Sequence, residues 1–205
     1  MNTEDIQGLA REICEECIRI LQEPEKSQAK PAIKVLCAFI STTRSFFSVI
    51  PRVAVFKYIP ASVSRYTISQ AIPHMVKLFL NPDELSNRVP ITVLLIDLVA
   101  AARDAMSESF AAPEPEVPLM PFKDEILGVF TAGLKATSSR QPALAGLKVM
   151  VNTPTLLADD ELGFIVHNVD GILQADPGDG DNAMFVNFLV SRRYSLIACA
   201  TATTR

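Results

Sequence analysis

The stretch that decides the fold is Asp5 to Thr43, DIQGLAREICEECIRILQEPEKSQAKPAIKVLCAFISTT. Its first half repeats apolar residues three or four positions apart, the spacing that lines one face of a helix. These residues are Ile6, Leu9, Ala10, Ile13, Cys17, Ile20 and Leu21. Pro24 ends this helix, and Pro31 stands in the first turn of a second one, where proline is tolerated. The residues expected to face inward there are Ala29, Ile33, Leu36, Cys37 and Ile40. The stretch therefore predicts an antiparallel pair of helices.

A helix pair of this length cannot cover its own apolar faces, so it has to stack against similar pairs. The 205 residues of the chain suffice for about four to five HEAT-type pairs of roughly 40 residues each. A hydrophobic content of 49% with 20% charged residues excludes disorder throughout. Few runs alternate in the period of a strand. The sequence predicts an all-α fold, an α-solenoid of HEAT-like antiparallel helix pairs that forms a single array over residues 1–205.

Charge and cysteine content exclude several functional classes. A net charge of −4 supplies no extended positive surface, so direct nucleic-acid binding is not expected. Four cysteines form no dense disulfide framework, which suits a reducing compartment. The N-terminus lacks the basic and apolar run of a secretory signal. The most apolar run, Ile91 to Ala102, contains Asp97 and is shorter than the roughly 20 residues that cross a bilayer, so no membrane segment is expected.

The helical pattern divides the chain into about four pairs, at residues 1–43, 62–107, 122–152 and 159–190. Residues 44–61 are apolar without a helical stripe and are interpreted as an insertion, residues 108–121 as a Pro-rich linker, and residues 191–205 as an irregular tail. The second helices begin near Ser27, Asp83, Ser139 and Asp181, which are 56, 56 and 42 residues apart. Removing the 18 inserted residues turns the first spacing into 38, close to a HEAT repeat.

The second pair has a strong apolar stripe. Its first helix places inward Ile68, Ile72, Met75, Val76, Phe79 and Leu80, with Pro73 as a kink or start. Its second helix is expected to begin at Asp83, whose carboxylate can cap the first amides, and to run to about Ser107. Pro90 is expected to bend it.

The third and fourth pairs follow the same pattern. The first helix of the third pair spans 122–136, and its inward residues are Ile126, Leu127, Phe130 and Leu134. The second spans 141–152, with Pro142 at its start, and its inward residues are Leu144, Leu147, Met150 and Val151. The fourth opens with Asp159, Asp160 and Glu161, acidic residues that the helix dipole favours in a first turn. Its stripe is Leu162, Ile165, Val166, Val169, Ile172 and Leu173, and its last helix begins with Phe185.

No motif predicts an active site. Cys14 and Cys17 have a metal-like spacing, but a zinc or iron–sulfur site needs three or four ligands, so they are interpreted as core or face cysteines. His74 and His167 stand in apolar helices without a neighbouring nucleophile. The loop DPGDGDN at 176–182 lacks the ligand spacing of a calcium-binding loop. We therefore expect a protein that is not an enzyme, with no catalytic, cofactor-binding or metal-binding residues.

The polar helix faces remain as a candidate partner surface. They carry Arg11, Glu15, Arg19, Lys30, Lys34, Lys77, Arg88, Arg103, Lys135 and Lys148. Most should be solvated, with pairs such as Glu15 and Arg19 one turn apart contributing a few tenths of a kcal/mol. A row of these residues along one side could also form a groove for a partner.

Three segments carry a family resemblance: ECIRILQEPEKSQAKPAIKVLCAFIST, SRYTISQAIPHMVKLF and LLADDELGFIVHNVDGIL. Together they resemble the fungal branch of the HEAT-repeat DNA-repair and transcription proteins first named for methyl methanesulfonate sensitivity. The likeness covers most of residues 1–43 and 62–189, and members of that family are about five times longer than this chain. Residues 44–61 and 190–205 depart from the pattern.

The resemblance implies a function in iron–sulfur cluster delivery. That family is the large adaptor of the cytosolic iron–sulfur targeting complex, which acts in the nucleus and cytoplasm. The chain would bring the assembly machinery to apo-proteins of DNA replication, repair and transcription, with proteins as its partners and no cofactor of its own. The alternative is another HEAT or armadillo-like binding scaffold, such as a fragment of a nuclear transport receptor or a phosphatase-type scaffold.

Overall fold

The part of the chain that the structure describes consists of helices, short 3₁₀ turns and connecting loops. The structure is a computed structural model, and it describes residues 3–41, 61–109 and 117–175. Within these ranges it contains seven α-helices and no strand, which confirms the all-α prediction. The chain divides into two compact units, Met1–Leu156 and Leu157–Arg205, and each is described here by itself.

Six of the helices belong to the first unit. They are α1 (Thr3–Ile20), α2 (Ala29–Ile40), α3 (Ala61–Leu80), α4 (Arg88–Ser109), α5 (Lys123–Gly133) and α6 (Thr137–Val151), with the 3₁₀ helices η3 (Pro82–Asn87) and η4 (Met120–Phe122) between them. The second unit contributes α7 (Asp159–Ala175). The predicted insertion at 44–61, except for its last residue, residues 110–116 of the predicted linker and everything after residue 175 lie outside the described residues. The first two residues of the predicted linker, 108 and 109, belong to α4.

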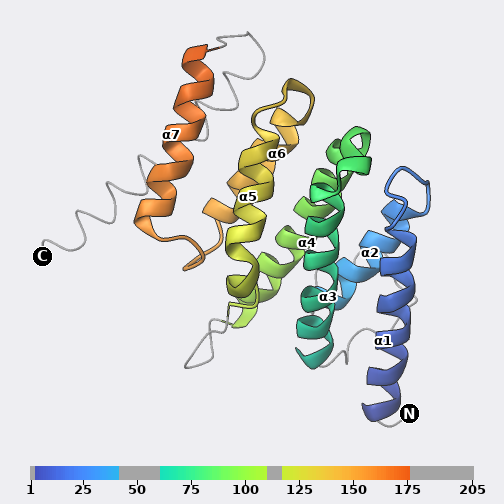
Figure 1. The fold of residues 1–205 in the computed structure, drawn as a ribbon. Coiled ribbons are helices and arrows are strands. Elements are labelled where there is room, and N and C mark those ends of the chain that lie inside the picture. Colours follow the sequence, from blue (N-terminus) through green and yellow to red (C-terminus); the bar gives the residue numbers. More distant parts are fainter. Residues whose placement is uncertain (1–2, 42–60, 110–116, 176–205) are drawn as a thin grey trace, which may run out of the picture. The chain divides into compact units, whose positions relative to one another are not determined.

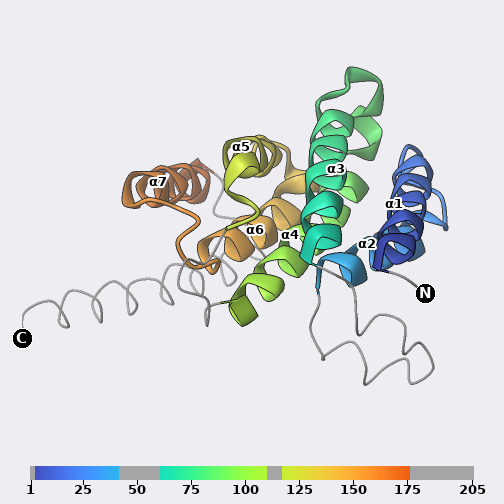
Figure 2. The same cartoon turned by 90° about the horizontal axis from the view of Figure 1, so that it is seen from below.

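The first unit has two layers of helices. Each of the pairs α1–α2, α3–α4 and α5–α6 is closed by a short turn, and its two helices pack together. In one layer α3 lies between α1 and α5, and in the other α4 lies between α2 and α6 (Figures 1 and 2). Consecutive pairs thus pack side by side, first helix on first helix and second on second.

The core lies between these two layers. Among the described residues, the largest fully buried side chains all belong to this unit: Phe79, Phe130, Leu21, Ile33, Leu36, Ile40, Ile68, Ile72, Met75, Ile91 and Leu95. Most of the predicted inward residues of α2, α3, α5 and α6 are among the buried ones, which confirms those faces. Since fully burying one such side chain contributes roughly 1.5–3 kcal/mol, the packing of the layers holds the helices in place.

Helix α4 occupies the middle of the unit and packs against α2, α3, α5 and α6. The stretch Pro82–Ala105 is long and apolar enough to cross a membrane, with a mean hydropathy of 1.5. Yet Ile91, Leu95 and Leu98 on this stretch are fully buried by protein. A core helix can have the same composition as a membrane span, and packing accounts for part of the hydrophobicity of α4, since 39% of its most apolar window is buried.

The predicted face of α1 is partly wrong. Ala10, Cys17 and Leu21 are buried as expected, but Leu9 is 48% exposed and Ile13 is 36% exposed. Cys14, which was not assigned to the stripe, is fully buried. The buried stripe of α1 is therefore rotated from the predicted one, because α2 and α3 cover only one flank of this terminal helix.

The turn between α3 and α4 also differs from the prediction. Asp83 does not cap the second helix: Asn81 caps η3 by accepting a hydrogen bond from the backbone N–H of Asp83, and α4 begins later, at Arg88. Pro90 consequently lies in the first turn of α4, where its missing N–H costs little, rather than at a bend. Leu80, predicted inward, ends α3 with 65% of its surface exposed.

Two small residues let α5 and α6 approach closely. A methyl group on Gly146 would lie 2.4 Å from Cε1 of Phe130, and one on Gly133 would lie 2.9 Å from Cβ of Ala143. Helix α6 begins at Thr137, earlier than predicted, so Pro142 lies inside the helix and not at its start. Leu119, assigned to the linker, is fully buried. This part of the predicted linker is therefore packed protein.

Helix α7 begins with the predicted acidic turn Asp159–Glu161. Ile165 and Val169 are buried as expected, whereas Val166 is 42% exposed and contradicts the predicted stripe. Between α6 and α7, Thr155 has a φ of 59°, in the left-handed region that a β-branched residue rarely adopts. The chain thus makes a strained turn where the first unit ends.

Candidate functional site

The cysteines of the Cys-Glu-Glu-Cys sequence lie inside the first unit. Cys14 is fully buried beside the hydroxyl of Thr67, and Cys17 is 6% exposed. Loss of solvent raises the pKa of both thiols, that of Cys17 to about 11, and burial raises the pKa of Cys37 to about 12. Nucleophilic and metal-binding cysteines act as thiolates, and burial disfavours the thiolate here. In 3–41, 61–109 and 117–175, no group of three or more His, Cys, Asp or Glu residues could hold a metal ion.

The two histidines lie in different surroundings. His74 is half-buried on α3, and its Nε2 has no hydrogen-bond partner among the described residues. Burial lowers its pKa, and the nearby charge of Lys77 lowers it further, so the imidazole is neutral near pH 7. His167 is exposed on α7, in the other unit. The structure does not bring either histidine together with a nucleophile in the part it describes.

Polar side chains join α1 to α3 in the layer formed by α1, α3 and α5; we call these contacts, made by Gln7, Arg11, Glu15, Ser62 and Tyr66, the polar seam. Tyr66 donates a hydrogen bond to Oε1 of Glu15 at 3.1 Å, and the guanidinium of Arg11 lies over the same ring at 5.4 Å from its centroid. Near the start of both helices, Gln7 donates to Oγ of Ser62 at 3.2 Å. Two residues of the predicted partner surface, Arg11 and Glu15, are therefore used to hold neighbouring helices together.

The predicted pair between Glu15 and Arg19 does not form. Arg19 instead donates two hydrogen bonds to Glu16, three positions earlier, while Glu15 is occupied by Tyr66. The pairing with Glu16 raises the pKa of Arg19, and it lowers the pKa of Glu16. Both spacings suit a helix, and the tyrosine on the neighbouring helix decides between them.

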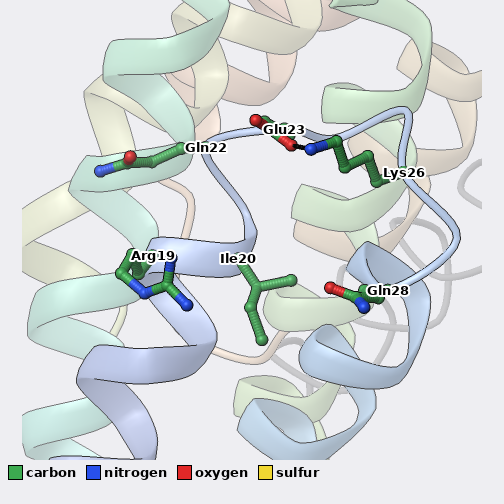
Figure 3. A pocket seen from close by; sticks show the side chains of 6 residues that line it. All are labelled: Arg19, Ile20, Gln22, Glu23, Lys26 and Gln28. Atoms are coloured by element: carbon green, nitrogen blue, oxygen red, sulfur yellow. Dashed lines mark ion pairs between the residues drawn. The ribbon is translucent and has the colours of Figure 1, made fainter.

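The turn between α1 and α2 encloses a polar hollow of about 190 Å³ (Figure 3). It is lined by Arg19, Ile20, Gln22, Glu23, Lys26 and Gln28. Lys26 forms an ion pair with Glu23 across the turn, and Arg19 is bound to Glu16, so both cations at this hollow already have carboxylate partners. An exposed hollow whose charges neutralise one another is best explained as a solvated turn.

Arg88 marks the start of α4 with an unusual set of contacts. Its guanidinium lies over the ring of Phe79, 5.1 Å from the centroid, while its Nε and Oδ1 of Asn87 are buried without a hydrogen-bond partner among the described residues. Asn87 donates through its amide nitrogen to Glu84 at 2.6 Å. The cation–π contact fastens the α3–α4 turn to the end of α3.

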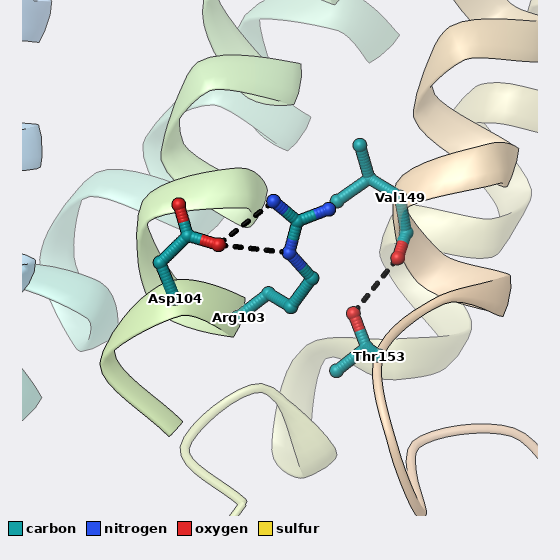
Figure 4. Close-up of polar contacts among 4 residues, drawn as sticks. All are labelled: Arg103, Asp104, Val149 and Thr153. Carbon is teal, nitrogen blue, oxygen red and sulfur yellow. Dashed lines mark hydrogen bonds and ion pairs between the residues drawn. The ribbon is translucent and has the colours of Figure 1, made fainter. Parts of the chain in front are cut away.

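Arg103 lies where α4 meets α6 (Figure 4). It donates two hydrogen bonds to Oδ1 of Asp104, at 2.7 and 2.9 Å, and its guanidinium extends toward Val149 of α6. Thr153, after the end of α6, donates to the carbonyl of Val149 at 2.8 Å. These contacts place a paired charge, rather than a free one, at the edge between the two helices.

Sequence reasoning missed Tyr66 and Asp97. Tyr66 contacts two charged groups of α1, the carboxylate of Glu15 and the guanidinium of Arg11. Partial desolvation raises the pKa of Asp97, and the nearby ammonium of Lys34 on α2 offsets part of that increase. A charged residue inside the most apolar run was a usable signal for Asp97. Nothing local marked Tyr66, since its partners lie about 50 residues earlier.

Comparison with known proteins gives no relative for this chain. No protein-family model matches it, and neither a curated protein nor a solved structure shows significant similarity.

Proposed function

We propose that the chain is an α-solenoid of HEAT-like helix pairs and serves as a non-catalytic scaffold for other proteins. The observation that carries the proposal is the packing of consecutive pairs in two continuous layers, with α1, α3 and α5 in one and α2, α4 and α6 in the other. Such an arrangement exposes one side of each layer along its length, which is the surface that repeat proteins use for binding. The interpretation of the buried cysteines as core residues agrees with a structural rather than a chemical use.

The identity of the partners is proposed from the resemblance noted in the sequence. On that basis the scaffold delivers the cytosolic iron–sulfur assembly machinery to apo-proteins of DNA replication, repair and transcription. The burial of Cys14 and Cys17 in the core of the first unit is consistent with a structural use of this cysteine pair.

Cross-linking in cells tests both levels of this proposal. A tagged full chain is cross-linked in its source cells, and the attached proteins are identified by mass spectrometry. Attachment of iron–sulfur assembly components and cluster-containing enzymes supports the delivery function, and deletion of the gene should then lower cluster occupancy of those enzymes before their abundance falls. Attachment of nuclear-pore repeats or a small GTPase instead would indicate a transport receptor. A chain that cross-links to no protein would contradict the scaffold function.

A further inference from the structure

The solvent-facing sides of α2, α4 and α6 form a surface that the core does not explain. We call it the α2–α4–α6 face and define it by Val93, Ile96 and Ala100 in its centre and by Lys30, Lys34 and Lys148 at its edges. The three helices pack in this order within one unit, so their outer sides lie next to one another (Figure 2).

The centre of the face is apolar. Val93, Ile96 and Ala100 are spaced by three and four residues, which puts them on one side of α4. Val93 is 41% exposed, and the other two are half-buried. The buried residues of α4, among them Leu95 and Leu98, lie on other sides of the helix and already supply its core contacts. The apolar strip of α4 is therefore additional to what folding of the unit requires.

The edges of the face are basic. Lys30 and Lys34 stand one turn apart on α2, Lys148 stands on α6, and all three are exposed. Of the charged residues of α4 in the described part of the chain, Asp97 lies within electrostatic reach of Lys34, and Arg103 and Asp104 pair with each other. Three exposed lysines thus stand against one exposed carboxylate, Asp97, in a chain whose net charge is −4. The charge of the face is opposite in sign to that of the whole protein.

We propose that the α2–α4–α6 face binds an acidic amphipathic segment of a partner protein, with its apolar side on the α4 strip and its carboxylates toward Lys34 and Lys148. This inference rests on the proposed scaffold function and names the chemistry of the partner. Burial of the apolar strip supplies affinity, and the lysines supply orientation and attraction at a distance. A nucleic acid fits less well, because an apolar strip gains nothing from a phosphate backbone.

A designed peptide provides the probe for this face. A short dye-labelled helical peptide carries leucines on one side and glutamates on the other, and a matched peptide carries lysines in place of the glutamates. Fluorescence anisotropy measures their binding to the full chain. We expect the glutamate peptide to bind, with affinity that falls as salt is added, and the lysine peptide not to bind measurably.

Matched variants assign the binding to the face. Lys34→Glu combined with Lys148→Glu should weaken binding of the glutamate peptide by about tenfold or more. Val93→Gln should also weaken it, since it removes the most exposed apolar group of the strip. Lys77→Glu, an exposed lysine on α3 in the other layer, makes the same kind of charge change and should leave binding within about twofold of the original. Circular dichroism confirms that each variant is folded.

Several outcomes would overturn the inference. The first three are that the folded protein does not bind the glutamate peptide, that it binds the lysine peptide equally well, or that Lys77→Glu weakens binding as much as the double variant does. The other two are that a DNA or RNA oligonucleotide displaces the peptide, or that the protein self-associates and the double variant abolishes this. Failure of the scaffold function is distinguishable, because it appears as absence of cross-linked partners. If cross-linked partners are retained by the Lys34→Glu, Lys148→Glu variant, the scaffold stands and the assignment of this face is wrong.

Discussion

Replacing Gly146 by alanine probes the close packing of α6 against α5. The added methyl would lie 2.4, 2.5 and 2.7 Å from three carbons of the Phe130 ring. Phe130 is fully buried, so its ring cannot turn away into solvent. Overpacking of this kind costs about 1–3 kcal/mol, and three simultaneous contacts favour the upper part of that range. Alanine regains roughly 1 kcal/mol through its higher helix propensity. We expect Gly146→Ala to lower the free energy of unfolding by about 1–2 kcal/mol.

Gly128 supplies the matched control. It is exposed in the middle of α5, and a methyl group there would meet nothing within 4 Å. Gly128→Ala should therefore raise the free energy of unfolding by about 0.5–1 kcal/mol, the ordinary gain of alanine over glycine in a helix. Urea denaturation followed by circular dichroism measures both variants, and their effects should have opposite signs.

A double variant separates the ring contact from other causes. In the background Phe130→Leu, which removes the ring, Gly146→Ala should be less destabilising by about 1 kcal/mol than in the original protein. If Gly146→Ala stabilised the chain as much as Gly128→Ala does, or if its effect were the same in both backgrounds, the close packing of α5 on α6 would be refuted.

Three further predictions concern thiols, strain and the polar seam. Burial raises the pKa of Cys17 to about 11 and that of Cys37 to about 12, above the ordinary 9.0. The stability that these neutral thiols contribute should therefore be constant below pH 9 and be lost as the pH rises from 9 toward 12. Urea denaturation at several pH values, compared with the Cys37→Ala variant, checks this. Thr155→Asn should raise the free energy of unfolding by about 0.5–1 kcal/mol, since asparagine tolerates a positive φ, and an unchanged or lower value would contradict the strain. Tyr66→Phe removes the hydrogen bond to Glu15 and should cost about 0.5–1 kcal/mol in urea denaturation, whereas a loss above about 2 kcal/mol would show a larger network than described.

The sequence allowed the helices of the first unit to be predicted, because their apolar spacing is long and regular. The buried stripe of α2 was predicted correctly, since α1, α3 and α4 all pack against this helix. On α1 the same reasoning misplaced Leu9 and Ile13, because periodicity shows that a face is apolar but not which flank has a neighbour. The sequence predicts a helix start at Pro142, because proline is tolerated in a first turn, whereas α6 begins five residues earlier, at Thr137.

The contacts at the candidate site were less accessible from sequence. The spacing of Cys14 and Cys17 led to their interpretation as core or face cysteines, and both are buried. The pairing of Arg19 with Glu16 could not be inferred from the sequence, because Glu15 and Glu16 both lie about one turn from Arg19. Tyr66 on α3 binds Glu15, which leaves Glu16 as the partner of Arg19. The α2–α4–α6 face depends on the order in which three separate helices pack, which no local pattern records.

The central place of α4 has a consequence for the synthesis of the chain. Translation proceeds from the N-terminus, so α4 emerges from the ribosome before α5 and α6, two of the four helices that cover it, have been made. During that interval Pro82–Ala105, which has the length and composition of a membrane span, lacks the cover that α5 and α6 provide. Targeting factors that recognise nascent membrane proteins read the same two properties. Packing of α6 on α4 covers part of this apolar surface, so the chain's likeness to a nascent membrane span is greatest before α6 is made.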